Sequence, residues 1–414
     1  MPFEIPVSWK WCKVDDFAYV ASGSTPDKSA FVEKGIPYLK MYNLKNQKID
    51  FDFKPQYIKE EVHNGKLQRS RTEVGDLIMN IVGPPLGKLA IIPSSLPQCN
   101  FNQAAVLIRP IVHKEIIVNF LYYYLSEMSE INSLQTRGNA GQDNISLTQC
   151  MGVHVPMPPL NEQKRIVAEI EKWFALINDL ETDKQELQEA IKKSKMKILD
   201  LAIHGKLVEQ DPNDEPASEL LKHIAPNAAL CDNSHYPNLL FEIPDNWVWV
   251  KLGDISDYGK CQNVSVEKIG QEEWVLELED IEKDTARIIQ FKTKSDREIK
   301  GTRHKFSKGC VLYSKLRTYL NKVLVPDKDG FCTTEIIPIN FAANIDSDYL
   351  CSVLRSQYFM DYTNQKGYGV KMPRLSTTDA KNGFIPLPPF AEQKRIVKTI
   401  EDTFAVLDAI IQEL

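Results

Sequence analysis

The chain has 414 residues, 43% of them hydrophobic, and a formal net charge of −6. This length is too great for one ordinary hydrophobic core and predicts two or three domains. The sequence lacks an apolar run long enough to span a membrane, and residues 1–13 lack a charged-then-apolar secretion signal. We therefore expect a soluble cytoplasmic protein without a membrane partner.

The eight cysteines are scattered, and none forms a C-x-x-C pair. A disulfide framework or a structural zinc site would place cysteines at short, regular spacings, so reduced and mostly buried thiols are expected. The seven histidines are also isolated in the sequence. These patterns predict no metal site and no cofactor held by this chain.

Two blocks of sequence occur twice, in the same order. One begins at Phe3 with Phe-Glu-Ile-Pro and two tryptophans, and it returns 238 residues later at Phe241. The other is Glu-Gln-Lys-Arg-Ile-Val, shortly after a Pro-Pro pair, which begins at Glu162 and returns 230 residues later at Glu392. The ends of the two copies match well and their middles match poorly. This pattern is typical of one scaffold that bears two different recognition surfaces.

Each copy mixes short β-rich runs with turns and short helices, over residues 1–155 and 239–385. Strands are predicted at residues 77–82, 89–92, 105–108, 311–313, 323–325 and 336–339. Short helices packed on the sheets are predicted at residues 120–125 and 349–354. The fold class is therefore α/β, with two α/β modules separated by long helices.

A heptad pattern follows the first Pro-Pro pair. Apolar residues alternate at spacings of four and three from Ile166 to Leu201, which predicts a coiled-coil helix over residues 161–204, about 65 Å long. Gly205 is the expected helix terminator. The second copy keeps this seam. The seam positions that identify the two helices are Ile166, Ile170, Trp173, Ile177, Leu180, Ile396, Ile400, Leu407 and Ile410.

The second helix is predicted to be about half as long as the first, since Leu414 corresponds to Lys184. A naturally short chain, a truncated chain and a chain completed by another polypeptide all fit this length. The stretch between the modules is rich in turn-forming residues and is the expected linker. The predicted division of the chain is 1–155, 156–208, 209–238, 239–385 and 386–414.

The sequence contains no recognisable catalytic constellation. It lacks the G-x-x-x-x-G-K-[ST] of a phosphate-binding loop and the Asn/Asp-Pro-Pro-Tyr/Phe motif of adenine methylation. Glu298 and Lys300 have the E-x-K spacing of some metal-dependent nucleases, but one such triplet is expected by chance. We predict no catalytic residues in this chain.

Charge is segregated in the second copy. Residues 287–328 hold twelve Lys or Arg against three acids, whereas residues 254–286 hold ten acids against three lysines. A basic face for DNA and an ordinary solvated charge run are both compatible with this pattern.

Donor-rich, glycine-containing loops occur at equivalent places in the two copies, at residues 137–144 and 366–374. Each alone is typical of an ordinary polar loop. In equivalent positions with different side chains, they favour variable DNA-reading loops, because Arg, Asn and Gln make the paired hydrogen bonds that distinguish bases. Similar reasoning gives the first module's candidates as Lys40, Tyr42, Asn43, Arg69, Arg71, Lys88, Asn102, Gln103, Arg137, Asn139, Gln142 and Asn144. The second module's candidates are Arg303, His304, Lys315, Arg317, Tyr319, Asn321, Lys322, Lys366, Tyr368, Lys371 and Arg374.

Together these motifs resemble the conserved regions of specificity subunits of type I restriction-modification systems. The resemblance lies in the Pro-Pro and Glu-Gln-Lys-Arg-Ile-Val helix starts, the heptad helix, the two Ile-Pro-x-x-Trp-x-Trp openings, and the stretch 205–217. It covers essentially the whole chain.

The resemblance implies that each module is a target recognition domain for one half of a bipartite double-stranded DNA site. The two helices would pack antiparallel and set the gap between the half-sites. Two methyltransferase subunits and a restriction and translocation subunit would be the partners. S-adenosylmethionine, ATP and magnesium would then be bound by those partners.

Two other functions are compatible with parts of the sequence. A cytoplasmic scaffold, with two protein-binding modules on a coiled coil, would show the same repeats. A stand-alone nuclease would have to be built around Glu298 and Lys300.

Overall fold

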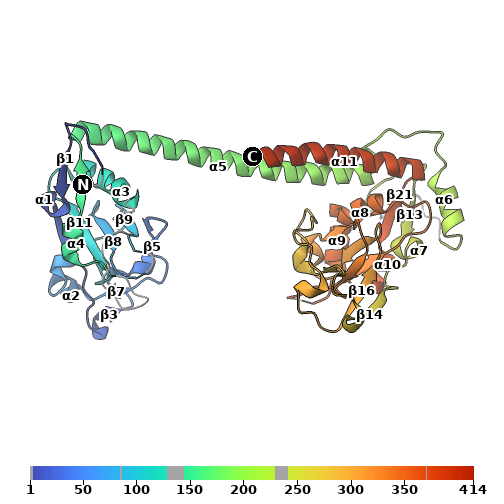
Figure 1. The fold of residues 1–414 in the computed structure, drawn as a ribbon, viewed down its shortest axis with the longest axis horizontal. Helices are drawn as coiled ribbons and strands as arrows, with labels where there is room; N and C mark the ends of the chain where they lie inside the picture. The colour runs from blue at the N-terminus through green and yellow to red at the C-terminus, as the bar shows by residue number, and fades with distance from the viewer. Residues whose placement is uncertain (1–2, 84–85, 128–143, 229–240, 370) are drawn as a thin grey trace. The chain divides into compact units, whose positions relative to one another are not determined.

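The computed structural model describes residues 3–83, 86–127, 144–228, 241–369 and 371–414. The chain divides into two compact units, Met1–Leu180 and Glu181–Leu414, each described here by itself (Figure 1). Helix α5 (Leu160–Ile203) begins in unit 1 and ends in unit 2. Within the described residues, no helix is long and apolar enough to cross a membrane.

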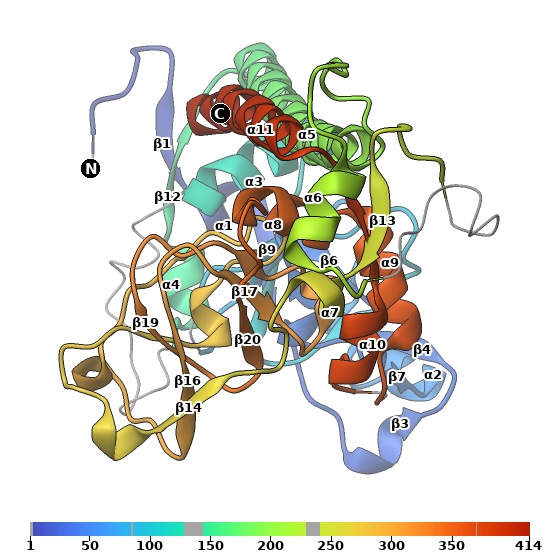
Figure 2. The same cartoon turned by 90° about the vertical axis from the view of Figure 1, so that its right-hand side faces the viewer.

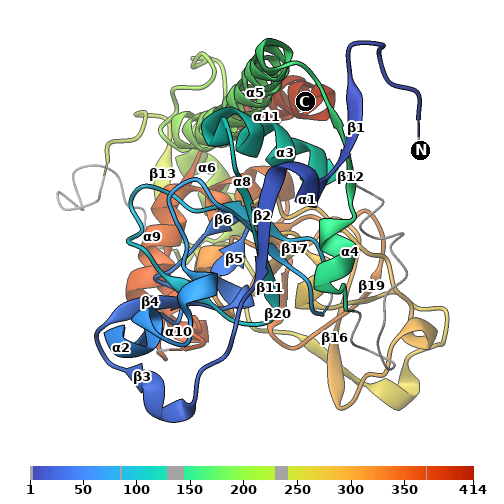
Figure 3. The same ribbon diagram turned by 90° about the vertical axis from the view of Figure 1, so that its left-hand side faces the viewer.

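Unit 1 is built on two four-stranded sheets. One has the order β2-β11-β8-β9, with all neighbours antiparallel; the other, β10-β4-β7-β3, includes a parallel pair. The strands are β2 (Ala18–Ser22), β3 (Phe31–Val32), β4 (Ile36–Leu39), β7 (Tyr57–Ile58), β8 (Leu77–Asn80), β9 (Leu89–Ile91), β10 (Asn100–Phe101) and β11 (Ala105–Pro110). Helix α3 (Lys114–Glu127) packs against β9 and β11, and its Phe120 and Leu121 are buried (Figure 3).

Shorter elements complete unit 1. Strand β1 pairs antiparallel with β12, and β5 pairs with β6. Their bounds, with those of the short helices, are β1 (Lys10–Lys13), β5 (Leu44–Lys45), β6 (Lys48–Ile49), β12 (His154–Met157), α1 (Val14–Phe17), α2 (Glu60–Asn64) and α4 (Leu147–Met151).

Unit 2 contains a four-stranded sheet, β14-β16-β19-β15, and a three-stranded sheet, β18-β17-β20. Strands β13 and β21 form a separate antiparallel pair. The strands are β13 (Val248–Lys251), β14 (Gln262–Ser265), β15 (Val275–Leu276), β16 (Thr302–Phe306), β17 (Val311–Ser314), β18 (Val323–Leu324), β19 (Gly330–Cys332), β20 (Ile336–Ile339) and β21 (Phe384–Leu387). The helices are α6 (Ala217–Ile224), α7 (Leu252–Ile255), α8 (Ser347–Arg355), α9 (Gln357–Lys366), α10 (Thr377–Asn382) and α11 (Phe390–Glu413).

The sequence repeat is also a structural repeat. Lys10 pairs with Met157 in unit 1, and the equivalent residues Val248 and Leu387 pair in unit 2. All the predicted strands and both short predicted helices lie within or overlap observed elements. The α/β fold class is confirmed.

In unit 2, the later part of α5 packs antiparallel against α11. Leu199 and Ala202 of α5 share a buried core with Ile396 and Ile400 of α11. Further along, Lys195 Nζ lies 2.5 Å from a carboxylate oxygen of Asp408. Figures 1 and 2 both show the two helices side by side. Residue numbers rise along one helix as they fall along the other, as expected for an antiparallel pair.

The earlier part of α5, in unit 1, leaves its seam uncovered by described residues. Trp173 is 55% exposed, Ile177 47% and Leu180 59%. In α11 the equivalent of Ile170, Ile400, is only 6% exposed. The heptad pattern is therefore continuous in sequence, but only its later part is buried within this chain.

Candidate nucleic-acid interface

The loop after one central strand pairs with a second loop in the same way in both units. In unit 1, Val82 follows β8 and forms an antiparallel bridge with Asn144. In unit 2, Leu316 follows β17 and forms the equivalent bridge with Arg374. These pairs match at the offsets of 234 and 230 that relate the copies in the sequence. The predicted reading loops are thus held at equivalent places on the scaffold.

Backbone hydrogen bonds join the two loops of unit 2. The Arg317 amide donates to the Pro373 carbonyl at 2.8 Å, and the Leu375 amide donates to the Lys315 carbonyl at 2.9 Å. Arg317 has a φ of 52°, in the left-handed region that residues with a side chain rarely adopt. We call the surface formed by residues 315–319 and 366–374 the reading surface of unit 2.

The reading surface combines exposed aromatic rings with unpaired positive charges. Tyr319 is 46% exposed and Tyr368 59%. Lys366 and Lys371 are exposed, and neither has an ion-pair partner among the described residues. Free cations that neutralise phosphates and exposed aromatic rings are side chains that nucleic acids contact.

Arg374 is already engaged in this structure. Its guanidinium makes an ion pair with Glu335 at 3.1 Å, and this carboxylate raises the pKa of Arg374. Glu335 also receives the Lys315 amide through its backbone carbonyl at 3.0 Å. Glu335 was not a sequence candidate, and it ties together the two loops that bear the free lysines.

Four other candidates of unit 2 are held by the scaffold. His304 is 7% exposed, and its Nδ1 lies 2.9 Å from the Ile336 carbonyl oxygen. Burial lowers the pKa of His304, and nearby Lys315 adds to this effect. Asn321 is buried and donates to the Arg355 carbonyl at 3.0 Å. These two side chains have no exposed edge with which to read a base, so we leave them out of the reading surface.

Arg303 and Lys322 are half-buried and bonded within unit 2. Arg303 pairs with Glu277 at 2.7 Å, and Lys322 Nζ donates to the Leu278 carbonyl at 2.6 Å. Burial lowers the pKa of Lys322. The acidic and basic runs of the sequence thus neutralise each other in part, as they also do in the Arg297–Asp280 pair at 2.9 Å. The basic face of unit 2 is smaller than the charge count suggests.

Three neighbouring candidates of unit 1 also have structural contacts. Asn43 is 1% exposed, and its side-chain amide donates to the carbonyls of Asp50 and Phe53 at 3.0 and 2.9 Å. Tyr42 donates to the Lys54 carbonyl at 3.1 Å. The ammonium of Lys40 lies 5.7 Å from the centre of the Phe31 ring. The Asn43 side chain organises this loop and has no free edge, so we leave it out of the proposed interface.

The remaining candidates of unit 1 differ in exposure. Arg69 and Gln103 are exposed, whereas Lys88, Asn102 and Asn144 are half-buried. Arg71 is also half-buried, and its Nε donates to the His63 carbonyl at 3.0 Å. Arg137, Asn139 and Gln142 lie outside the described residues.

The nuclease hypothesis finds no support in the described part of the chain. Glu298 and Lys300 are 85% and 88% exposed, and they lie 3.4 Å from each other in a surface ion pair. The described residues contain no group of three or more His, Cys, Asp or Glu that could hold a metal ion. An exposed pair without further carboxylates cannot position a divalent cation.

Comparisons with known proteins agree with this construction. The family model of the type I restriction modification DNA specificity domain matches residues 6–190 and 244–414. The EcoDI specificity subunit of Escherichia coli is 24% identical over 76% of this chain and 68% of its own length. The EcoEI specificity subunit of the same species is 23% identical over 100% of this chain and 80% of its own length.

Solved structures share the fold. A chain from a study of assembly and conformational transition in a type I restriction-modification system superimposes with a TM-score of 0.63 at 17% identity, covering 100% of this chain and 94% of that one. The HsdS subunit of Thermoanaerobacter tengcongensis gives a TM-score of 0.57 at 18% identity, covering 100% and 93%. The chain belongs to the family of type I restriction-modification specificity subunits.

Proposed function

We propose that each unit of this specificity subunit reads one half of a bipartite DNA target. The observation that carries the proposal is the repeated loop pair, Val82 with Asn144 and Leu316 with Arg374. The scaffold around it is the same in both units, but the loop side chains differ. Equivalent positions with different donors would read different base sequences.

The helices α5 and α11 would set the distance between the two half-sites. Their antiparallel packing in unit 2 supports this role, because a packed helix pair is a stiff spacer. Two methyltransferase subunits and a restriction subunit would supply the chemistry. S-adenosylmethionine, ATP and magnesium would be bound by those subunits, and this chain would add no catalytic group of its own.

A module exchange tests the half-site assignment. Residues 14–155 are replaced by the corresponding segment of a relative with a different target, and the methylated motif is determined in cells that contain the methyltransferase subunits. One half of the motif should change while the other half and the gap stay the same. A change in both halves would contradict the assignment of one unit to one half-site.

The second candidate function is a protein-binding scaffold. It is favoured by the exposed apolar seam at Trp173, Ile177 and Leu180, which is a protein-contact surface. A complex with the methyltransferase that neither binds nor methylates specific DNA would support the scaffold over the reading function.

A further inference from the structure

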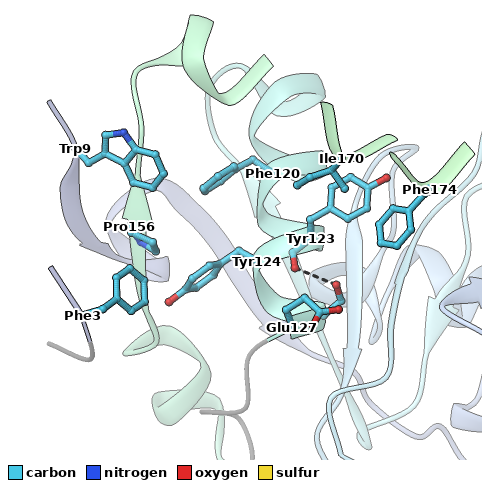
Figure 4. A pocket seen from close by; sticks show the side chains of 10 residues that line it. Phe3, Trp9, Phe120, Tyr123, Tyr124, Glu127, Pro156, Ile170 and Phe174 are labelled. Atoms are coloured by element: carbon cyan, nitrogen blue, oxygen red, sulfur yellow. Dashed lines mark hydrogen bonds between the residues drawn. The ribbon is translucent and has the colours of Figure 1, made fainter. Parts of the chain in front are cut away.

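Unit 1 contains an aromatic cavity of about 370 Å³ next to the start of α5 (Figure 4). Three parts of the unit line it: the N-terminal segment, helix α3 and helix α5. Its main walls are the side chains of Phe3, Trp9, Phe120, Tyr124, Ile170 and Phe174. We call these residues, with Glu162 at the start of α5, cradle 1.

Unit 2 contains the same construction, which we call cradle 2: Phe241, Trp247, Tyr349, Glu392 and Ile400. The ring centres of Trp9 and Phe120 are 6.4 Å apart, and so are those of Trp247 and Tyr349. The ring centres of Phe3 and Trp11 are 5.0 Å apart, and those of Phe241 and Trp249 are also 5.0 Å apart. The two cradles therefore have matching aromatic frameworks.

Cradle 2 is filled by a segment of the same chain. The ring of His204, near the end of α5, lies 3.9 Å from the ring of Phe241. The next residue, Gly205, has a φ of +63°, and a Cβ placed there would be 2.3 Å from Pro244 Cγ and 3.3 Å from an atom of the Trp247 ring. Only glycine allows the backbone to pass so close to these side chains.

Polar contacts complete the docking of this segment. Gln210 Nε2 donates to one oxygen of Glu392 at 2.5 Å, and the Trp247 indole N–H donates to the other oxygen at 2.9 Å. Asp214 pairs with Arg395, one helical turn along α11, at 2.7 Å. Leu220 and Leu221 of α6 are then buried in the same core. Glycine, glutamine and aspartate at positions 205, 210 and 214 are therefore the signature of the occupant.

In cradle 1 the corresponding groups have no such occupant among the described residues. The indole Nε1 of Trp9 is enclosed but has no hydrogen-bond partner. Glu162 and Arg165, the equivalents of Glu392 and Arg395, make no hydrogen bond or ion pair with described residues. Phe3 is 50% exposed and Phe174 52%, whereas Trp247 is 2% exposed. A buried donor without an acceptor is costly, which favours occupation of this place.

We propose that cradle 1 is a docking site for a partner polypeptide segment built like residues 195–224 of this chain. The segment would end an amphipathic helix on Ile170 and Phe174, pass Trp9 with a glycine, and reach Glu162 with a glutamine. An aspartate four residues after that glutamine would pair with Arg165. The inference is drawn from cradle 2 and does not depend on DNA reading.

A fluorescent synthetic peptide of residues 195–224 tests the proposal by anisotropy titration with the full chain. We expect saturable binding that the Glu162→Ala substitution weakens at least about tenfold, since a charge-assisted hydrogen bond is lost. Glu162 is half-buried at a helix start, and circular dichroism checks that the variant folds. Glu169→Ala, on an exposed position of the same helix, is the matched control and should bind like the parent chain.

A double-mutant cycle then identifies the contact. The Gln210→Ala peptide should bind the parent chain about as weakly as the parent peptide binds the Glu162→Ala chain, and combining both changes should cost little more. Additive effects would contradict the proposed contact. Absence of saturable binding, or binding that Glu162→Ala leaves unchanged because the peptide displaces the native segment from cradle 2, would overturn the proposal.

Discussion

The indole N–H of Trp247 donates to a carboxylate oxygen of Glu392 at 2.9 Å, across 145 residues of sequence. Both residues belong to the repeated blocks, and both are buried. Burial raises the pKa of Glu392, while the hydrogen bonds from Trp247 and Gln210 act in the opposite direction. This contact joins the beginning of the second module to the helix that follows it, and Gln210 attaches the linker to the same carboxylate.

Replacement of Glu392 by alanine should destabilise unit 2 by about 2–4 kcal/mol. The substitution leaves the buried Trp247 and Gln210 donors without an acceptor, and each unsatisfied group is costly. The free energy of unfolding from urea titration measures the effect. Glu401→Ala, at an exposed position of the same helix, should change it by less than about 0.5 kcal/mol. Equal effects of the two substitutions would rule out a structural role for the buried carboxylate.

Gly205→Ala should cost more than Gly309→Ala. Both glycines have positive φ, +63° and +80°, so each substitution carries a backbone penalty of about 1–2 kcal/mol. A Cβ at Gly309 meets nothing within 4 Å, whereas one at Gly205 overlaps Pro244. Overlap in a packed site adds about 1–3 kcal/mol. Thermal and urea unfolding of the two variants give the difference, and equal losses would argue against close packing at Gly205.

Stability should depend on pH through His304. Its folded-state pKa is lowered by burial, so the unfolded chain binds a proton more readily than the folded chain does. The His304 contribution is fully present above the ordinary pKa of 6.5 and is lost as pH falls through that value toward the lower folded-state pKa. Urea unfolding between pH 5 and 8 should show this loss in the parent chain, and it should be smaller in His304→Gln. An identical pH dependence in both would contradict a lowered pKa.

Removal of the free lysines of the reading surface should weaken DNA binding with little regard to sequence. Lys366→Ala and Lys371→Ala each delete one proposed phosphate contact, which lowers the salt dependence of log K by about 0.9 per contact. Binding is measured for the assembled complex with the methyltransferase over a series of salt concentrations. Lys398→Ala, at an exposed position on α11, is the control. An unchanged salt slope in both loop variants would remove residues 366–371 from the DNA surface.

Insertion of one heptad into α5 after Leu180 should lengthen the gap in the target. Seven residues add about 10 Å of helix, close to three base pairs of DNA. A full heptad keeps the same residues on the same face, so both half-sites should stay unchanged. The methylated motif of the variant gives the result. A change in either half-site, with the gap unaltered, would show that the helices do not act as a spacer.

The periodic elements could be predicted from the sequence, and the contacts between distant loops could not. Residues 161–204 were predicted as helix, and α5 runs from Leu160 to Ile203, because a long apolar period leaves little ambiguity. The repeated blocks predicted the equivalent strand pairs β1–β12 and β13–β21. The bridge of Leu316 with Arg374 joins residues far apart in sequence, and no local pattern marks it.

Individual site residues were harder to predict because charge alone does not determine exposure. His304 lies in a basic run, yet it alternates with Arg303 and Lys305 along β16 and points inward with Phe306. A period-two pattern over residues 302–306 would have identified it as a core residue. Asn43 is buried by loop hydrogen bonds that depend on Asp50 and Phe53, and the sequence gives no sign of them.

The central claim is tested most directly by genome-wide mapping of methylated adenine in cells that co-express this chain with its methyltransferase. The account predicts one bipartite motif with a fixed gap, which disappears when this chain is omitted. A stable complex that methylates no specific motif, or a motif that persists without this chain, would contradict it.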